Sequence, residues 1–336
     1  MFKNDNKTVL LTGGTGFIGH HLFRYIMENT DWNVIILDRF SYAGSCERLK
    51  IPDDYKYSHR WKLIHHDLRS AFNYDIVLKL SKYKFNFILH LAASTHVDRS
   101  ISNPMDFVLD NVVGTCHLLE WYRYQSKRAI FLYFSTDEVF GPQIGENRAK
   151  ESDCYNSNNP YAATKAGAEE LCLAYANTYD LDIRITHTMN VFAEGQHIEK
   201  FIPLCVKRIM SGEEIQVHAN ADCSVSSSRC YIHAKKVAEA VLFVLKHGKQ
   251  REKYNIVGQR EITNEDLVIM IAGILNIKPN YKLVDFHSSR PGHDLRYALD
   301  GTKLKNMGFC YNEDNFEINL IQTVKWYSKL WNISAK

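Results

Sequence analysis

Short apolar runs alternate with helical patterns through the first half of the chain. The runs are rich in Val, Ile, Leu and Phe and are bounded by Gly, Asp, Ser or Asn, as is typical of strands buried on both faces of a sheet. We predict six strands, at residues 8–11, 34–37, 61–66, 86–91, 129–134 and 183–189. Helical periodicity follows several of them, most clearly at 107–124 and from Tyr161 onward. This alternation predicts an α/β fold with a doubly wound parallel sheet of the Rossmann type.

Beyond residue 190 the alternation gives way to irregular polar segments at 194–200, 220–229 and 287–296. We therefore predict a dinucleotide-binding domain at 1–190, to which a segment near 230–257 returns. A smaller, interleaved C-terminal domain at 191–336 is expected to bind mainly substrate. The last stretch, 318–331, has helical periodicity and is expected to pack back on the body.

Composition and charge speak against several classes of function. The net charge of +3 is small for 336 residues, so we expect no nucleic-acid or membrane partner. No apolar run reaches the length of a membrane span, and the first strand starts too early to leave room for a signal peptide. The eight cysteines contain no Cys-x-x-Cys pair, which favours reduced thiols in the cytoplasm. The histidines show no His-Glu-x-x-His arrangement, and we predict no metal.

A glycine-rich segment, Thr12-Gly-Gly-Thr-Gly-Phe-Ile-Gly19, joins the first strand to the helix after it. Its glycines permit a tight turn, close approach of the backbone to a pyrophosphate, and close packing of helix on strand. The anion then lies at the helix N-terminus. A glycine cluster alone is often only a loop, but between a strand and a helix it indicates dinucleotide binding. We predict cofactor contacts at Gly13, Gly16, Phe17, Ile18 and Gly19.

Asp38 ends the second strand, where a carboxylate can hold the adenosine ribose hydroxyls and repel a 2′-phosphate. NAD is therefore favoured over NADP. Arg39 is the opposing signal, because an arginine at this place can accept that phosphate. Asp67 ends the third strand and either lies near the adenine or caps a helix that begins near Ser70. Further cofactor contacts are predicted at Phe40, Ser41, Leu68, Leu91, Ala92, Ala93 and Thr95. The small residues at 92–94 let the backbone approach a ribose or phosphate.

The candidate catalytic residues lie in two blocks. Thr136, Asp137 and Glu138 follow an apolar strand and so emerge at its carboxyl end, where open α/β sheets place their ligands. Tyr161 and Lys165 are four residues apart and share one face of a predicted helix. A lysine there is expected to stabilise the phenolate, lower the pKa of the tyrosine and make it a base near neutral pH. Tyr-x-x-x-Lys also occurs on surface helices and acidic pairs also cap helices, but the combination favours catalysis.

Polar loops in the second half supply cations that suit a diphosphate, although scattered cations are usually solvent-facing. His96 follows the fourth strand in a polar run that is expected to face the cleft, but it could equally be a buried, hydrogen-bonded structural histidine, and we assign it no proton-transfer role.

These motifs resemble the extended short-chain dehydrogenase/reductase family and, within it, the nucleotide-sugar 4,6-dehydratases typified by dTDP-glucose 4,6-dehydratase. The similarity covers nearly the whole chain and rests on Thr12–Gly19, Tyr42–Gly44, Leu91–Ser100, Ser135–Gly141, Tyr161–Lys165, Glu199–Pro203 and Arg290–Asp294. The Thr-Asp-Glu sequence at 136–138 is the specific part, since enzymes of the family that only epimerise differ at the two acidic positions. The resemblance implies a hydro-lyase of deoxysugar or rhamnose biosynthesis, with NAD as cofactor, and a homodimer paired through the helices from Phe107 and Tyr161.

The resemblance also implies residue roles. Tyr161, helped by Lys165 and Thr136, removes the O4 proton while hydride leaves C4 of the glucosyl unit for NAD. Glu138 then takes the C5 proton as Asp137 protonates the departing C6 hydroxyl, and hydride returns to C6. Substrate contacts are implied at Thr95, Thr136, Asn190, Lys200, Arg229, Asn264, Arg290 and His293.

Some positions depart from the family pattern. Ala193-Glu194 replaces a usual Gly-Pro, and Cys230 and Lys236 stand where acidic residues are usual. Val191 replaces a second asparagine of many bacterial members, a feature that looks more like plant and animal enzymes, some of which use UDP-glucose. The nucleotide is thus open between dTDP and UDP. Alternative readings are a 4-epimerase or decarboxylase of NDP-sugars and a non-catalytic nucleotide sensor, although a sensor would not need the whole catalytic set.

Overall fold

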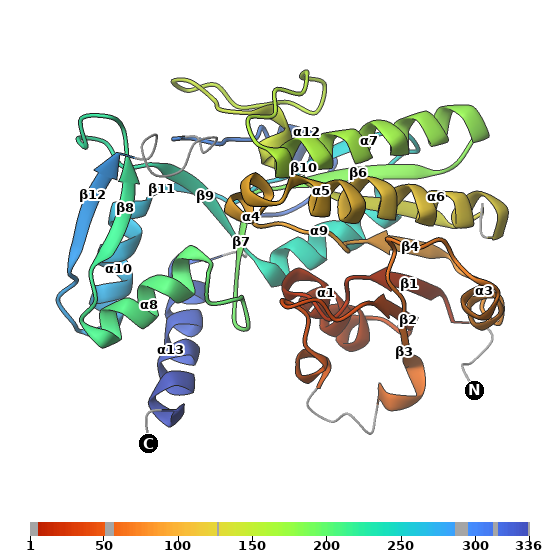
Figure 1. Cartoon of the computed structure of the whole chain (residues 1–336), viewed down its shortest axis with the longest axis horizontal. Helices are drawn as coiled ribbons and strands as arrows, with labels where there is room; N and C mark the ends of the chain where they lie inside the picture. The colour runs from red at the N-terminus through yellow and green to blue at the C-terminus, as the bar shows by residue number, and fades with distance from the viewer. Residues whose placement is uncertain (1–5, 51–56, 126–127, 286–294, 312–314, 335–336) are drawn as a thin grey trace.

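The fold is built around one seven-stranded parallel sheet with the strand order β10-β6-β5-β4-β1-β2-β3 (Figure 1). The structure is a computed structural model and describes residues 6–50, 57–125, 128–285, 295–311 and 315–334. The strands are β1 Thr8–Thr12, β2 Asn33–Asp38, β3 Trp61–His65, β4 Phe87–His90, β5 Ile130–Thr136, β6 Ile183–Thr188 and β10 Lys253–Ile256. The predicted α/β class and the six predicted strands are confirmed, with ends that differ by at most two residues.

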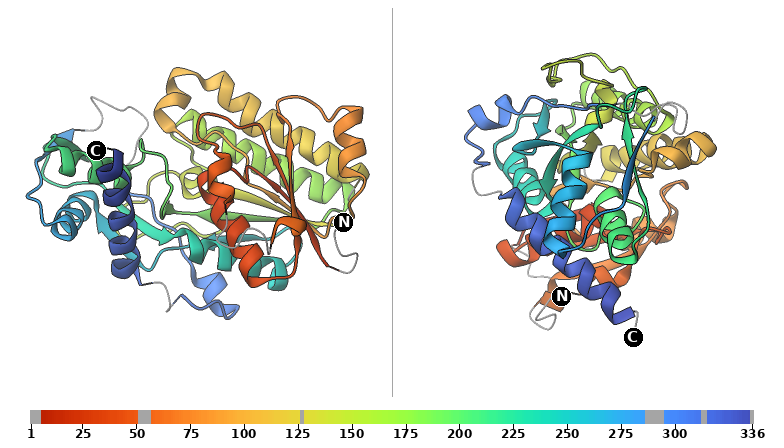
Figure 2. Two further views of the ribbon diagram at one scale, coloured as in Figure 1. Left: turned by 90° about the horizontal axis from the view of Figure 1, so that it is seen from below. Right: turned by 90° about the vertical axis from the view of Figure 1, so that its left-hand side faces the viewer.

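Helices cover both faces of this sheet (Figure 2). One face packs against α1 Phe17–Asn29 and α9 Ala234–His247, and the other against α3 Tyr74–Leu80, α6 Gly114–Gln125 and α7 Pro160–Tyr179. Successive side chains of a strand point to opposite faces. Val9 and Leu11 therefore join the first core while Leu10 joins the second, and all three are fully buried. This burial on both faces is why the strands read as continuous apolar runs.

The strand order reverses between β1 and β4, which places a crevice at their carboxyl ends. The glycine-rich loop after β1 and the small residues after β4 meet at this point. The β10 strand lies in the segment 230–257 and pairs in parallel with β6. The division into two domains at residue 190 stays a prediction.

The helix predicted at 107–124 is not continuous. A short helix, α5 Pro104–Phe107, leads into a π-helical segment, Val108–Val113, which continues into α6. The π-helical turns bring Asn111 inward, where its side chain pairs with both the backbone N–H (2.8 Å) and the carbonyl (3.0 Å) of Ser94. A buried polar group that binds a neighbouring loop explains this departure, and such segments are frequent at functional sites.

The second half of the chain adds two small sheets with their own core (Figure 1). One sheet has the order β11-β9-β7, with β7 Asn190–Phe192, β9 Ser228–His233 and β11 Arg260–Thr263. The other consists of β8 Ile215–Ala219 and β12 Tyr281–Asp285. The helices α8 Phe201–Ser211, α10 Asn264–Leu275 and α13 Phe316–Ser334 pack on these sheets. Two short helices lie against the large sheet's side of the molecule: α4 Val97–Ser102 contacts α5 and α7, and α12 Thr302–Asn306 contacts β10. The expected C-terminal helix is confirmed, and Tyr327 ties it to the carbonyl of Gln196 at 2.8 Å. No helix in the described ranges is long and apolar enough to cross a membrane.

Candidate active site

A cleft with a volume of about 360 Å³ opens where the carboxyl ends of the parallel strands face the smaller sheets. Its size and its place at the reversal of strand order are typical of ligand sites in doubly wound folds. Most of the predicted site residues line it, namely Gly13, Gly16, Phe17, Ile18, Gly19, Asp38, Arg39, Ser41, Asp67, Leu68, Leu91, Ala92, Ala93, Thr95, Thr136, Asp137, Glu138, Tyr161, Lys165, Asn190 and Lys200.

Three described candidates, Phe40, Asn264 and Arg229, do not line this cleft. Phe40 is 37% exposed and stacks on His65 with 5.6 Å between the ring centroids. Asn264 starts α10, where its amide donates to Ser227 Oγ (2.8 Å) and accepts from the hydroxyl of Tyr231 (3.0 Å). The Tyr231 side chain does line the cleft, so Asn264 reaches it only through this neighbour.

Arg229 does not line the cleft either. Its guanidinium donates to the carbonyl of Leu295 at 2.7 Å and lies over the ring of Tyr297. Its positive charge nevertheless lowers the pKa of both acidic candidates in the cleft, so it lies within electrostatic reach. Arg290 and His293 lie outside the described residues.

The glycine-rich loop has no room for a side chain at Gly13 or at Gly19. Gly13 has φ +71°, and a Cβ added to it would lie 2.7 Å from the backbone nitrogen of Ala92. A Cβ added to Gly19 would lie 2.1 Å from the carbonyl oxygen of Gly13. The loop therefore brings bare backbone to the start of α1, whose first N–H groups face the cleft and suit a pyrophosphate.

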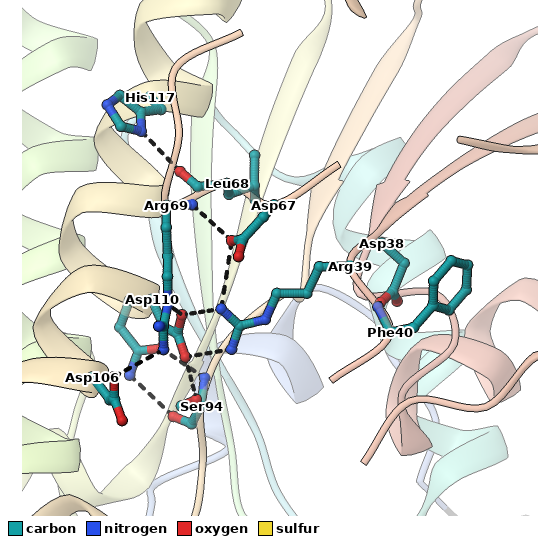
Figure 3. A network of polar contacts seen from close by, with 11 residues as sticks. Asp38, Arg39, Phe40, Asp67, Leu68, Arg69, Ser94, Asp106, Asp110 and His117 are labelled. Atoms are coloured by element: carbon teal, nitrogen blue, oxygen red, sulfur yellow. Dashed lines mark hydrogen bonds and ion pairs between the residues drawn. The ribbon is translucent and has the colours of Figure 1, made fainter. Parts of the chain in front are cut away.

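The acidic residue after β2 is tightly held. The carboxylate of Asp38 accepts from the backbone N–H groups of Thr15 and Phe40, both at 2.9 Å. The neighbouring Arg39 turns to Asp110, which meets its guanidinium at 2.5 and 2.7 Å (Figure 3). Asp110 was not predicted from sequence, since it lies in the unforeseen π-helical segment.

Asp67 does not cap a helix. The helix expected near Ser70 begins at Tyr74 and is capped by Asn73, whose side chain accepts from the N–H of Ile76. Asp67 instead accepts from Arg39 at 3.4 Å (Figure 3). The capping alternative is therefore wrong.

Tyr161 faces the acidic pair, and its environment differs from the one predicted. Burial raises its pKa, the charge of Glu138 raises it further, and a hydrogen bond with Thr136 lowers it. Lys165 donates to the carbonyl of Phe134 at 2.7 Å, so its ammonium is directed to the strand backbone. The prediction that Lys165 lowers the pKa of Tyr161 in this structure is thus wrong, because the partner of the lysine is a backbone oxygen.

Asp137 and Glu138 begin a 3-10 turn directly after β5. Burial raises the pKa of Asp137 to about 6, while a hydrogen bond from Thr136 (3.0 Å) opposes the shift. Burial, followed by the charge of Asp137, raises the pKa of Glu138 to about 7. Two carboxyl groups that titrate close to neutral pH can exchange acid and base roles in one reaction.

Asn159 is a site residue that sequence reasoning missed. Its side-chain oxygen caps α7 by accepting from the N–H of Ala162 (2.8 Å), and its amide donates to Glu138 Oε2 at 3.1 Å. One residue thus places both Tyr161, two positions later, and the carboxylate of Glu138. The signal was present, because Asn before Pro160 is a typical helix start.

Glu169 was missed as well. It lies one turn after Lys165 on α7, is fully buried, and accepts from Tyr155 (2.6 Å), His187 (2.9 Å) and Ser135. Burial lowers the pKa of Lys165 to about 8, and the charge of Glu169 acts against this. The Lys165–Glu169 spacing of four residues was the available sequence signal.

Comparison with known proteins shows to which family this chain belongs. The profile of the GDP-mannose 4,6 dehydratase family matches residues 10–312. The chain belongs to this family. It is 36% identical to a dTDP-glucose 4,6-dehydratase of Haemophilus influenzae, over 97% of this chain and 99% of that protein.

Two further similarities extend this result. The chain is 34% identical over 96% of its length to a trifunctional protein of Arabidopsis thaliana that includes UDP-glucose 4,6-dehydratase, and it spans only 47% of that protein. A dTDP-glucose 4,6-dehydratase from Streptomyces venezuelae, solved with NAD bound, superposes with a TM-score of 0.85 at 33% identity and covers 96% of this chain and 97% of that one.

Proposed function

We propose that this chain is a hydro-lyase that converts an NDP-glucose into an NDP-4-keto-6-deoxyglucose and water. The observation that carries the proposal is the acidic pair: Asp137 and Glu138 lie side by side in the cleft, and the pKa of each is raised towards neutrality. Loss of water across C5 and C6 requires one group that takes a proton and one that gives a proton. The family and the relatives named above support the same chemistry.

The cleft suits NAD as the cofactor. Gly13 and Gly19 let the loop pack closely on Ala92 and on itself, which brings its backbone to the cleft where a pyrophosphate fits, and Asp38 marks the ribose end. NAD held there would supply the hydride acceptor for oxidation at C4 and the hydride donor for reduction at C6. The related Streptomyces enzyme was crystallised with NAD.

The residues of the chain carry the proton transfers. Tyr161, in its phenolate form, takes the O4 proton as C4 is oxidised, and the hydrogen bond with Thr136 stabilises this phenolate and so lowers the pKa of Tyr161. Because the resulting 4-keto group makes the C5 proton acidic, Glu138 can remove it. Asp137 then gives a proton to the C6 hydroxyl, which leaves as water. The return of hydride to C6 and of a proton to C5 completes the product.

Lys200 and Arg229 are proposed to hold the diphosphate, and Thr95 and Asn190 the sugar. Lys200 precedes α8, and its Nζ donates to the carbonyl of Thr95 at 3.4 Å, which joins the start of α8 to the loop after β4 at the cleft. The charges of Lys200 and Arg229 both reach Glu138, whose pKa they lower. We extend the same proposal to Asn264, Arg290 and His293.

The test is incubation of the protein with dTDP-glucose and, separately, UDP-glucose. A product with the alkaline absorbance of a 4-keto-6-deoxy sugar is expected, whereas NDP-galactose as the product would refute dehydration in favour of epimerisation. The kcat/KM for the two substrates decides between thymine and uracil, since relatives of both kinds are similar to this chain.

A variant separates the steps. Glu138→Gln is expected to oxidise C4 and then stall, because an amide cannot take the C5 proton. The stalled protein would contain NADH, visible by its absorbance, and would release a 4-keto-glucose. Full turnover by this variant would show that another group is the base.

We also propose a homodimer in the cytoplasm, as part of rhamnose or another deoxysugar pathway. The helices α6 and α7 pack side by side on one face of the sheet, and exposed apolar or aromatic residues such as Met105, Tyr124 and Tyr179 lie along this region. Light scattering that gives the mass of one chain would refute the dimer.

A further inference from the structure

Arg39 meets two carboxylates, a distant one on Asp67 at 3.4 Å and a close one on Asp110 (Figure 3). Both terminal nitrogens of its guanidinium donate to Asp110, at 2.5 and 2.7 Å. Only 6% of the Asp110 side chain is exposed, against 27% for Arg39, so the pair forms at the wall of the cleft and not on the open surface. A two-pronged bond of this kind fixes the direction of the guanidinium as well as neutralising its charge.

Asp110 is itself anchored. Arg69 donates to one of its oxygens at 2.5 Å, and the hydroxyl of Ser94 donates to the other at 2.5 Å. Each carboxylate oxygen thus accepts two hydrogen bonds, which uses its whole capacity. Although burial works in the opposite direction, these bonds keep the pKa of Asp110 below its usual value, and the group stays ionised.

The location of Arg39 makes this arrangement relevant to the cofactor. Arg39 follows Asp38 directly, and both line the cleft at the ribose end of the predicted cofactor site. A free arginine at this place would accept a 2′-phosphate. Because Asp110 already occupies both ends of the Arg39 guanidinium, a 2′-phosphate would meet the negative charge of Asp38 without Arg39 to offset it. The other arginine of this group in the cleft, Arg69, is likewise paired, with Asp110 and Asp106.

We propose that Asp110 is a specificity-determining residue for the cofactor: it holds Arg39 away from the ribose 2′ position and thereby excludes NADP. Asp38 repels the phosphate, and Asp110 withdraws the cation that would compensate for this repulsion. Selection therefore depends on a residue of the π-helical segment as well as on the end of β2. The inference rests on the use of NAD by the chain and does not depend on the dehydration step.

The experiment is calorimetric titration of the full chain, freed of bound nucleotide, with NAD and with NADP. Asp110→Asn keeps the shape but weakens the hold on Arg39, so we expect the ratio of the NADP Kd to the NAD Kd to fall by about tenfold. Asp106→Asn is the matched control, because Asp106 lies on the same stretch of helix but, among the described residues, forms its ion pair with Arg69 (3.2 Å) and not with Arg39. The ratio of the NADP Kd to the NAD Kd should be the same in Asp106→Asn as in the wild-type chain.

Arg39 supplies the second arm. Adding Arg39→Gln to Asp110→Asn should cancel the gain in NADP affinity, because the released guanidinium is what binds the phosphate. An unchanged ratio in Asp110→Asn, with NAD still bound, would overturn the proposal and leave Asp38 as the sole determinant.

A third arm does not depend on the folding of the Asp110 variant. In the otherwise unchanged chain, Arg39→Gln should raise the ratio by less than about threefold, since Arg39 is already withdrawn. A tenfold rise would show that Arg39 reaches the phosphate despite Asp110 and would refute the idea. Loss of dehydration with an intact preference for NAD would count against the proposed function alone.

Discussion

The acidic residue Asp137 should lower the stability of the folded protein at the pH where it works. Its side chain is only 4% exposed, and Oδ2 has no hydrogen-bond partner among the described residues. Burial raises its pKa from 3.8 to about 6. We therefore expect Asp137→Asn to abolish dehydration and yet increase the free energy of unfolding above neutral pH.

The magnitude follows from the shift. Ionising the Asp137 carboxyl costs more free energy in the folded state than in the unfolded state. For a shift of about two pKa units, the difference is about 3 kcal/mol. The folded state holds the proton more tightly, so the wild-type protein loses this stability as pH rises from about 4 to above 6, while the asparagine variant does not. The asparagine oxygen can still accept the hydrogen bond from Thr136. Its amide nitrogen takes the place of the unpartnered Oδ2, and burying this donor without a partner lowers the free energy of unfolding by about 1 kcal/mol at every pH. The net gain at pH 8 is then about 2 kcal/mol.

The assay is urea unfolding of the wild-type and variant chains between pH 4 and pH 8. The difference between them should grow by about 3 kcal/mol or more across this range, and the comparison cancels groups that titrate alike in both. Glu138 does not cancel and adds to the difference, because the charge of Asp137 raises its pKa. Asp31→Asn is the matched control, since Asp31 is exposed and the same substitution there should change stability by less than about 0.5 kcal/mol. A difference that stays constant with pH would refute the reasoning that the buried carboxyl is destabilised by ionisation.

Three other substitutions test the site. Tyr161→Phe should slow C4 oxidation by about a hundredfold or more while NAD still binds, as single-turnover formation of NADH would show. Asn159→Ala should cost about 1 kcal/mol by loss of the cap and move the acid limb of the pH–rate profile to higher pH, because the bond to Glu138 lowers the pKa of that group. Glu169→Ala should cost about 3–5 kcal/mol in urea unfolding, because it leaves a buried imidazole and two hydroxyls without their partner, whereas Glu170→Ala on the exposed side of α7 should cost less than about 0.5 kcal/mol. Equal effects of the last two would contradict the role of the buried network.

The central sheet was predictable because β1, β2, β4, β5 and β6 are buried on both faces, so that the sequence itself carries the signal. The edge strand β3 is only partly buried and was found from its apolar residues and its place in the alternation. The smaller sheets were not predicted. Strand β8 alternates buried and exposed residues, as in Ile215, Gln216 and Val217, but it is short and pairs with β12, far away in sequence. The register of such a pair depends on tertiary packing that no local pattern records.

The same distinction applies to the site. Residues in compact motifs, such as Thr136 and Tyr161, were found because local spacing places them at a strand end and on a helix face. Asp110 could not be found, because its relation to Arg39 depends on a π-helical turn and on contacts between distant segments. The direction of Lys165 was mispredicted for a similar reason, since its partner is a backbone carbonyl of β5.

The pairing of β10 with β6 has a consequence for synthesis of the chain. On the ribosome, the partner of β6 emerges only after residues 189–252 have been made, so the edge of β6 stays unpaired while β7, β8 and β9 appear. An open strand edge can recruit other chains. Release of a nascent chain that stops before Lys253 should therefore give a product prone to aggregate.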